Sequence, residues 1–209
     1  VVGTNSCADL NWIQAYGIVD NDRRSNREIV ALKTRKIFAL PIYDIESIYY
    51  HPEMYQKLAN RLAGYTGIDP VQAIEKANNQ IIKAASMHEL RLCQRVCEKR
   101  ARDILDTAKP TSSDMTSKIP ITVTIDIPSI VGEEVVALKD AIQSRNVSKI
   151  MSCYPMRETE AVKDIANCLE FRNRKQYEEA IRKMLADDES ALKFVRSLFE
   201  DLTQQILSE

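Results

Sequence analysis

Short apolar segments alternate with polar breaks over the first fifty residues, a pattern typical of the strands and helices of an α/β unit. The apolar stretches 12–19 and 36–40 each predict a buried strand. Between them, 25–34 predicts a short helix, because Ser25 and Glu28 have the spacing of a capping box. A strand, a short helix and a strand in this order predict two parallel neighbouring strands.

From about residue 44 the pattern becomes helical. Helices are expected over 52–63 and from 70 to about 107, because no Gly or Pro interrupts the second stretch after Pro70. The polar segment 109–118 predicts a linker, and the alternation of apolar residues with Thr and Asp over 119–127 predicts an exposed strand. The remaining chain predicts an extended piece at 147–154 and helices at 133–145, 158–170, 174–186 and 189–207.

These patterns predict a helix-rich α/β chain in two parts. Residues 1–108 are expected to form an α/β region that ends in a long helix, and residues 119–209 a mostly helical module. The 209 residues are enough for one large domain or two small ones with a hydrophobic core. With 44% hydrophobic and 28% charged residues, the composition is that of an ordinary folded protein and excludes disordered and collagen-like classes.

The composition also bears on the compartment. No apolar stretch approaches the roughly 20 residues that cross a bilayer, and the first residues lack the basic and apolar regions of a secretory signal. The five cysteines are odd in number and scattered, which favours reduced thiols over a disulfide framework. We therefore expect a cytoplasmic protein with no membrane partner. Because residue 1 is Val, we expect a processed chain or a piece of a longer one.

The net charge of −1 excludes a strong field of the kind that marks a general nucleic-acid binder. The charge is uneven, since residues 1–110 hold 16 basic and 13 acidic side chains and residues 111–209 hold 13 and 17. Four basic residues of the long expected helix recur at helical spacing on one face: Arg91, Arg95, Lys99 and Arg102. Such a stripe either follows a nucleic-acid backbone or forms an ordinary solvated face.

The candidate chemistry lies at Asp20-Asn21-Asp22, directly after the first expected strand. Two carboxylates at the end of a strand offer the hard oxygen ligands that suit Mg²⁺ or Mn²⁺. Ligands of α/β sheets also bind at the carboxyl ends of strands. The alternative is a simple turn, because Asp and Asn are common turn residues.

Glu46 follows the second expected strand, and parallel pairing would bring it to the same edge of the sheet as the two aspartates. It lies between Ile45 and Ile48, where an unpaired carboxylate would be costly to bury and a metal ion would offset that cost. The alternative is a salt bridge with a nearby arginine: Arg23, Arg24 or Arg27.

The segments 17–23 (GIVDNDR) and 40–46 (LPIYDIE), with a short helix between them, resemble the second half of a Toprim-type domain. Such domains occur in overcoming-lysogenization-defect-like nucleases and related ATPase-associated phage-defence proteins. The resemblance covers residues 1 to about 60, with a looser likeness at 174–181. It implies a partial Toprim-like parallel sheet followed by a mostly helical C-terminal module.

The resemblance also implies a function. Family members are metal-dependent nucleases that are fused to or work with an ABC-type ATPase, so it implies phosphodiester hydrolysis of DNA or RNA in phage defence. Asp20, Asp22 and Glu46 would be the metal ligands and catalytic groups, with Mg²⁺ or Mn²⁺ as the cofactor. Arg23 and Arg24, which follow the DxD motif, would join the basic stripe in binding nucleic acid.

The sequence departs from the family pattern, because it lacks the upstream V-E-G-x-x-D motif that supplies a further Glu. Nineteen residues precede Asp20, so we expect that strand and its Glu to lie before residue 1, with Val1 to Gly3 ending an intervening strand. On that expectation the isolated chain binds metal poorly and cleaves nothing.

Three alternatives to this function stay open. Haloacid-dehalogenase-like phosphatases and nucleotide-sugar glycosyltransferases share the DxD strand, but neither explains the Leu-Pro and Ile-Glu segment. The phosphatases also require Thr or Val after the second Asp, where this chain has Arg23. The third alternative is a non-catalytic module that binds a partner or assembles with further copies of itself.

Overall fold

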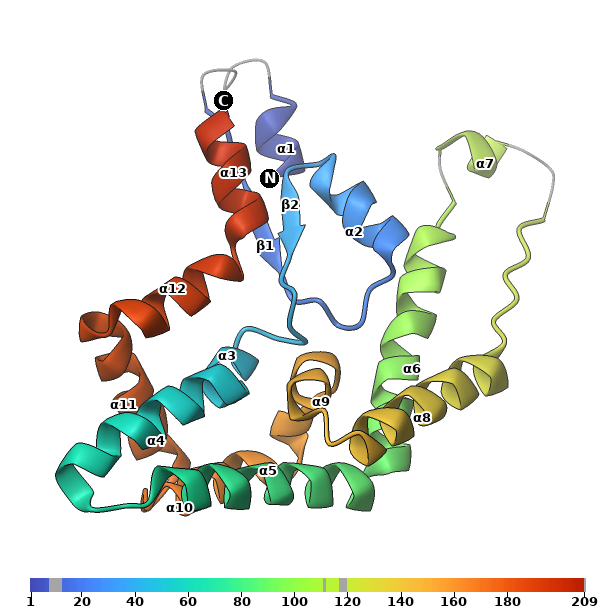
Figure 1. The fold of residues 1–209 in the computed structure, drawn as a ribbon. Helices are drawn as coiled ribbons and strands as arrows, with labels where there is room; N and C mark the ends of the chain where they lie inside the picture. The colour runs from blue at the N-terminus through green and yellow to red at the C-terminus, as the bar shows by residue number, and fades with distance from the viewer. Residues whose placement is uncertain (8–12, 111, 117–119, 209) are drawn as a thin grey trace.

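The computed structural model describes residues 1–7, 13–110, 112–116 and 120–208. It consists of a helical body with a small sheet at one end (Figure 1). The sheet has two strands, β1 (Gly17–Val19) and β2 (Ile37–Ala39), which pair in parallel with Ile18 opposite Phe38. The helix-rich α/β class and the parallel pair are thus confirmed. Both strands are shorter than expected, and residue 12 lies outside the described residues.

Capping groups in the sequence fix several helix ends. α2 (Asn26–Lys33) connects the strands, and the predicted capping box is present: Ser25 accepts from the Glu28 N–H, and the Glu28 carboxylate accepts from the Ser25 N–H. α4 (Pro52–Thr66) is capped at its start by His51 and at its end by Gly67, whose φ of 73° is in the left-handed region that favours glycine.

The remaining helices make up most of the structure. α1 (Val2–Asn5) and α3 (Ser47–Tyr50) are single turns. The longer helices of the first half are α5 (Pro70–Met87) and α6 (Glu89–Thr107), and a short α7 (Ser112–Thr116) follows. The second half contains α8 (Ile127–Gln143), α9 (Val147–Cys153), η2 (Met156–Glu158), α10 (Ala161–Cys168), α11 (Arg174–Asp187), α12 (Glu189–Ser197) and α13 (Glu200–Ser208).

The single helix expected from 70 to 107 is wrong, because the chain breaks at His88 into α5 and α6. The buried residues of α5 include Ala77 and Ile81, and those of α6 include Leu92 and Val96. At 3.6 residues per turn, the two sets would lie roughly a third of a turn apart on one straight helix. The break lets both apolar faces reach the same core, and no Gly or Pro is needed for it.

Two segments expected to be extended strands differ in the structure. Residues 147–153 form α9, capped by the Asn146 side chain, which accepts from the Lys149 N–H at 2.9 Å. The strand expected over 119–127 is absent from 120–126, and α8 begins at Ile127, earlier than the expected 133. Residue 119 lies outside the described residues.

Smaller corrections concern the chain ends and two further helices. Val2 to Asn5 form a helical turn, so the expected strand end at 1–3 is wrong. The helix expected over 158–170 is split into η2 and α10, and the one over 189–207 into α12 and α13. The helix expected over 174–186 is confirmed as α11.

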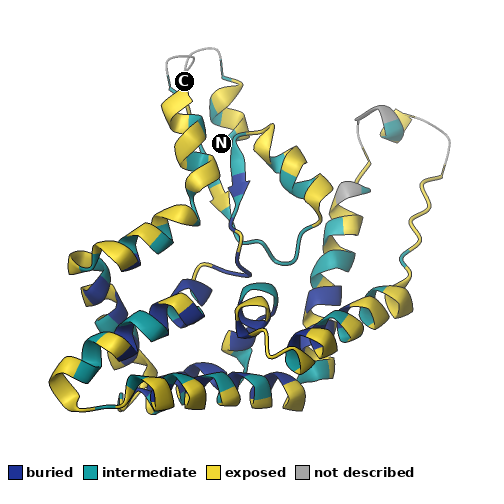
Figure 2. Cartoon of the chain, viewed as in Figure 1, coloured by how far each residue is buried: buried dark blue, intermediate teal, exposed yellow. Residues whose placement is uncertain are grey.

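The main hydrophobic core runs through the helical body (Figure 2). It takes buried residues from both 1–108 and 119–209, and α6 packs along α8 while α5 packs along α10. A second, smaller cluster holds the segment after β2: Leu40, Ile42 and Ile48 pack against residues of 195–199 at the end of α12. This cluster fixes the position of Asp44 and Glu46. No helix among the described residues is long and apolar enough to cross a bilayer.

Candidate nucleic-acid and metal site

The loops that follow the two strands lie side by side. The Asp22 N–H donates to the Tyr43 carbonyl at 3.1 Å, and the Ile45 N–H donates to Asp20 Oδ1 at 3.1 Å. The predicted acidic residues Asp20, Asp22 and Glu46 therefore occupy the same edge of the sheet, at the carboxyl ends of β1 and β2. The sequence-based placement of Glu46 beside the two aspartates rested on parallel pairing, and that pairing is present.

The carboxylates repel one another across this edge. Burial raises the pKa of Asp20, and the negative charges of Asp22, Asp44 and Glu46 raise it further, while the hydrogen bond from the Ile45 N–H works against the shift. The negative charges of Asp22, Asp44 and Glu46 therefore make ionisation of Asp20 less favourable.

Basic side chains from other elements neutralise the acids. Lys99 of α6 places its Nζ 3.3 Å from Asp22 Oδ2 and 3.8 Å from Asp103 Oδ1. Arg24 bridges the same two aspartates, with its terminal nitrogens 3.9 Å from Asp22 and 3.8 Å from Asp103. Asp22 thus lies between a lysine and an arginine that the sequence assigned to nucleic acid.

Arg157 of η2 neutralises the acids that follow β2. Its Nη1 donates to Glu46 Oε2 at 2.8 Å, and its Nε lies 3.3 Å from Asp44 Oδ2. The partner of Glu46 is therefore Arg157 and not one of the arginines of the β1–α2 loop. Glu46 and Arg157 are 111 residues apart, so no local pattern could have found this pair.

Asp44 is an acid that the sequence analysis missed. Its side chain is only 4% exposed, and its Oδ1 accepts hydrogen bonds from the Ser47 N–H and hydroxyl at 2.8 and 2.7 Å. Its Oδ2 accepts no hydrogen bond from the described part of the protein, although Arg157 lies close to it. The D-x-E spacing of Asp44 and Glu46 was the available signal.

A polar cleft of about 210 Å³ opens beside these acids. Its lining includes four basic and three acidic side chains with Tyr43: Arg95, Lys99, Arg102, Arg157, Asp22, Glu98 and Glu158. Burial, and then the charges of Asp22, Asp44 and Glu158, raise the pKa of Tyr43 to about 12, so its phenol is neutral and can donate a hydrogen bond. The cleft joins one predicted acidic residue to three residues of the predicted basic stripe.

The stripe itself is present on α6, but its members are paired with acids. Arg91 and Arg95 reach Glu158 at 3.5 and 3.0 Å, and Arg102 reaches Glu98 at 3.9 Å. Arg91, Arg95 and Arg102 remain exposed to solvent. Exposed pairs of this kind contribute little to stability, so these arginines can exchange their partners at small cost.

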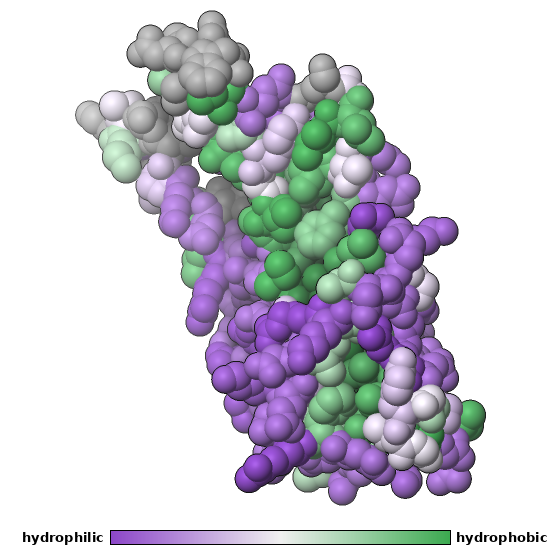
Figure 3. Space-filling model, turned by 90° about the vertical axis from the view of Figure 1, so that its left-hand side faces the viewer, coloured by the Kyte–Doolittle hydropathy of each residue, from purple (hydrophilic) through white to green (hydrophobic). Residues whose placement is uncertain are grey.

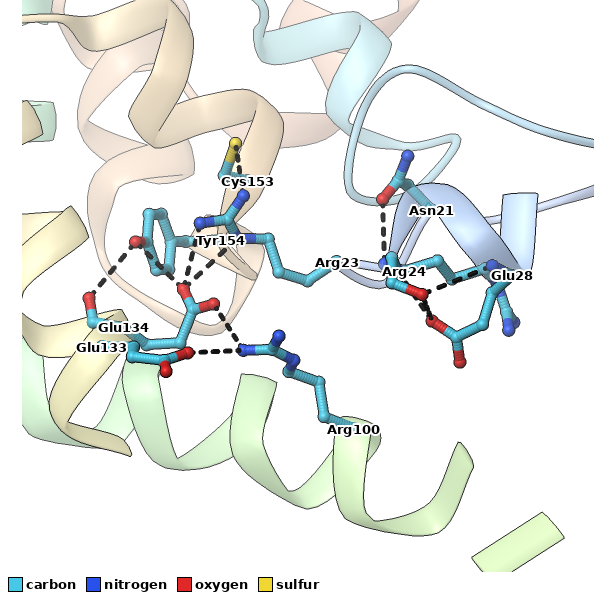
Figure 4. A network of polar contacts seen from close by, with 10 residues as sticks. Asn21, Arg23, Arg24, Glu28, Arg100, Glu133, Glu134, Cys153 and Tyr154 are labelled. Carbon is cyan, nitrogen blue, oxygen red and sulfur yellow. Dashed lines mark hydrogen bonds and ion pairs between the residues drawn. The ribbon is translucent and has the colours of Figure 1, made fainter. Parts of the chain in front are cut away.

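Arg23 differs from the other predicted nucleic-acid residues, because it points into the helical body (Figure 4). Its Nε and Nη2 both donate to Glu134 Oε2 at 3.2 Å, and Arg100 donates to Glu134 Oε1 at 3.2 Å. Burial lowers the pKa of Arg23, but the charges of Glu134, Cys153 and Tyr154 outweigh it and raise the pKa overall.

This buried network anchors the loop that carries the DxD motif. Asp22 and Arg23 have φ values of 49° and 64°, in the left-handed region that non-glycine residues seldom adopt. The turn they form aims Arg23 at α8 and Asp22 at the cleft. No pattern in the sequence predicts that Glu134 and Arg100 help to anchor this loop, or that Arg157 pairs with the acids after β2.

The acids have the chemistry of a divalent-cation site but not its arrangement. Carboxylate oxygens suit Mg²⁺ and Mn²⁺, and Asp44 Oδ2 is a buried acceptor that no hydrogen bond satisfies. Within the described ranges, however, no group of three or more His, Cys, Asp or Glu side chains is placed to hold a metal ion. Instead, Lys99 forms an ion pair with the Asp22 carboxylate and Arg157 with that of Glu46, so the acids as arranged do not fit a bound cation.

Comparisons of the chain with family models, with curated proteins and with solved structures found no significant match.

Proposed function

We propose that this chain is the Toprim-like part of a nuclease that acts with an ABC-type ATPase in phage defence. The observation that supports it is the polar cleft, which Asp22 and Tyr43 of the loops after β1 and β2 line together with basic side chains of α6 and η2. A phosphodiester backbone carries one negative charge per nucleotide, and Arg95, Lys99 and Arg102 are spaced along one helix face to meet successive phosphates.

In a nuclease, the basic residues of this cleft and the acids at the strand ends would have different roles. Lys99, Arg102 and Arg157 would bind and orient the phosphate backbone, and the Tyr43 phenol would donate a hydrogen bond to it. Asp20, Asp22 and Glu46 would act on the scissile phosphate with Mg²⁺ or Mn²⁺. The chemistry that such a cation supplies is activation of water and stabilisation of charge on the phosphate. Because the acids as arranged do not fit a cation, we derive no reaction step through one.

The second candidate is a non-catalytic module that binds a partner or a second copy of the chain. This candidate is favoured by the ion pairs that Lys99 and Arg157 form with Asp22, Asp44 and Glu46. These pairs neutralise the carboxylates at the edge of the sheet without a metal ion. Apolar side chains also gather on the face of the molecule that carries α12 and α13 (Figure 3). On α13, Ile206 and Leu207 are exposed, and such a surface suits a protein partner.

Cleavage of DNA and RNA by the full-length cytoplasmic protein, with Mg²⁺ or Mn²⁺ added, separates the candidates. We expect Asp20→Ala and Glu46→Ala each to lower the rate by at least about a hundredfold, because each removes a carboxylate from the reacting centre. Glu75→Ala removes an exposed carboxylate of α5 and should leave the rate unchanged.

Full activity in both Asp20→Ala and Glu46→Ala would contradict the site. Absence of cleavage of either nucleic acid by the unmodified protein would contradict the nuclease proposal and leave the binding module.

A further inference from the structure

The polar cleft has a deep part and a rim, and their residues differ in exposure. Tyr43 is 8% exposed and the Lys99 side chain is 31% exposed, so both lie in the deep part. Arg102 lines the rim, with 71% of its side chain exposed. The volume of about 210 Å³ is that of roughly seven water molecules at about 30 Å³ each. This is room for a phosphate group and its sugar, and far too little for a double helix.

The Tyr43 hydroxyl is an unused hydrogen-bond donor in the deep part. Burial raises the pKa of Tyr43 to about 12, so the hydroxyl keeps its proton. Its backbone carbonyl accepts from the Asp22 N–H, but no group within the described ranges accepts a hydrogen bond from its hydroxyl. An enclosed polar group of this kind is costly unless a ligand or water satisfies it. A phosphate oxygen, which accepts hydrogen bonds, is a suitable partner.

The charge of the cleft is too small to hold a nucleic acid by long-range attraction alone. Its four basic side chains exceed its three acidic ones by one, and the whole chain has a net charge of −1. Binding must therefore depend on short contacts with the donors inside the cleft.

The two forms of nucleic acid differ in their access to these donors. A double helix is stiff over roughly 150 base pairs, so its phosphates reach the rim of the cleft but not Tyr43 or Lys99. The backbone of a single strand bends at each nucleotide and can place one phosphate beside both side chains.

We infer that the cleft takes single-stranded nucleic acid and excludes the double helix, with one backbone phosphate held by Lys99 and the Tyr43 hydroxyl. This inference rests on the proposed function, in which the ligand is a nucleic acid, and names the form of that substrate. Among the described residues that line the cleft, Tyr43 alone is aromatic, and it is too enclosed to stack on a base. The bases therefore stay outside, and binding does not depend on base sequence.

The test compares two fluorescent probes that have the same number of phosphates, a single-stranded oligonucleotide and a hairpin duplex. Their affinities for the 209-residue chain are measured by anisotropy at one salt concentration. We expect the single strand to bind at least roughly tenfold more tightly. Lys99→Gln and Tyr43→Phe should each weaken single-strand binding by roughly threefold to tenfold, because each removes one contact with the phosphate, and should leave duplex binding unchanged.

Two matched controls separate these contacts from general effects. Arg91→Gln removes a positive charge from the same face of α6 outside the cleft, and Tyr65→Phe removes an exposed hydroxyl of α4. Each control should change the affinities for the two probes by the same factor. A second single strand of different base sequence should bind as tightly as the first. Circular dichroism checks that every variant is folded.

Three results would overturn the inference. The first is equal affinity of the unmodified chain for the single strand and the hairpin. The second is that Lys99→Gln and Tyr43→Phe weaken the binding of both probes by the same factor, or of neither. The third is that the unmodified chain binds neither probe.

These outcomes differ from failure of the nuclease proposal. Tighter binding of the single strand, with no cleavage by the full-length protein, would keep the inference and reject the nuclease. Cleavage that is lost in Asp20→Ala, with the hairpin bound as tightly as the single strand, would do the reverse.

Discussion

Glu134 is a charged side chain that the protein encloses almost completely, with 6% of the side chain exposed. Two arginines and the Tyr154 hydroxyl donate to its carboxylate. A buried charge is tolerated only when such partners replace the lost water, so Glu134 and its partners act as a unit. Through Arg23, this unit holds the DxD loop against the helical body.

Replacing Glu134 with Gln should therefore lower the free energy of unfolding by about 2 kcal/mol, because both arginines lose their charged acceptor. Urea unfolding measures the change. Glu133→Gln is the control, since the Glu133 side chain is 68% exposed and lies 4.0 Å from Arg100. An equal effect of the two substitutions would show that the network does not anchor the loop.

The residues of the site were predictable only in part. Asp20, Asp22 and Glu46 are visible in the sequence because Asp20 and Asp22 come at once after the apolar segment that forms β1, and Glu46 lies in the segment that follows β2. Arg157 lies 111 residues from Glu46 and Glu134 lies 111 residues from Arg23, and only the packed fold brings each pair together. Arg23 was assigned to nucleic acid from its place beside the motif, and its burial depends on a left-handed turn that no neighbouring residue specifies.

At the scale of elements, local signals predicted helix starts and tertiary packing decided helix ends. The capping box of α2 and the Asp69-Pro70 start of α5 depend on neighbours in sequence, and both are present. The breaks after Met87 and after Ser197 occur without Gly or Pro. The first lets the apolar faces of α5 and α6 reach the same core, whereas α13, beyond the second, has no buried residue. Packing against the core also places Val147 and Ile150 in a helix, although their side chains favour strands.

His51 makes the start of α4 sensitive to pH. Its Nδ1 accepts from the Glu53 N–H, and its ring stacks on Phe194 with centroids 4.8 Å apart. Burial lowers the pKa of His51 below the usual 6.5, although the charge of Glu53 works against the shift. The unfolded chain therefore binds a proton more readily than the folded one, and stability falls as the pH drops below about 6.5.

Asn at this position keeps a side-chain acceptor for the helix but does not titrate. We expect the free energy of unfolding of His51→Asn to fall less than that of the unmodified chain between about pH 7.5 and about pH 5.5. Denaturant unfolding at both pH values measures this, because the two proteins differ only at residue 51. Parallel losses in the two proteins would contradict the role of His51.

At the scale of the whole molecule, the fold joins features that lie far apart in the sequence. The main core contains residues from Tyr43 to Ala191, so the helices on both sides of 109–118 position the cleft together. α6 brings the basic stripe to the acids of β1 and β2, and η2 adds Arg157 from the other side. The sequence indicated Asp22 and the basic stripe separately, and their meeting in one cleft is a property of the packed helices.

We propose that this cleft binds a nucleic-acid backbone. The direct test is the affinity of the 209-residue chain for a short fluorescent oligonucleotide, measured by anisotropy over a range of salt concentrations. We expect the triple variant Lys99→Gln/Arg102→Gln/Arg157→Gln to bind more weakly, with a salt dependence that is smaller by up to about three phosphate contacts.

The matched control removes three exposed lysines of α5, α10 and α11: Lys83→Gln/Lys163→Gln/Lys175→Gln. We expect this control to keep the affinity and salt slope of the unmodified chain, while the cleft variant binds more weakly and has a smaller salt slope. Equal binding by the two triple variants at every salt concentration would contradict it.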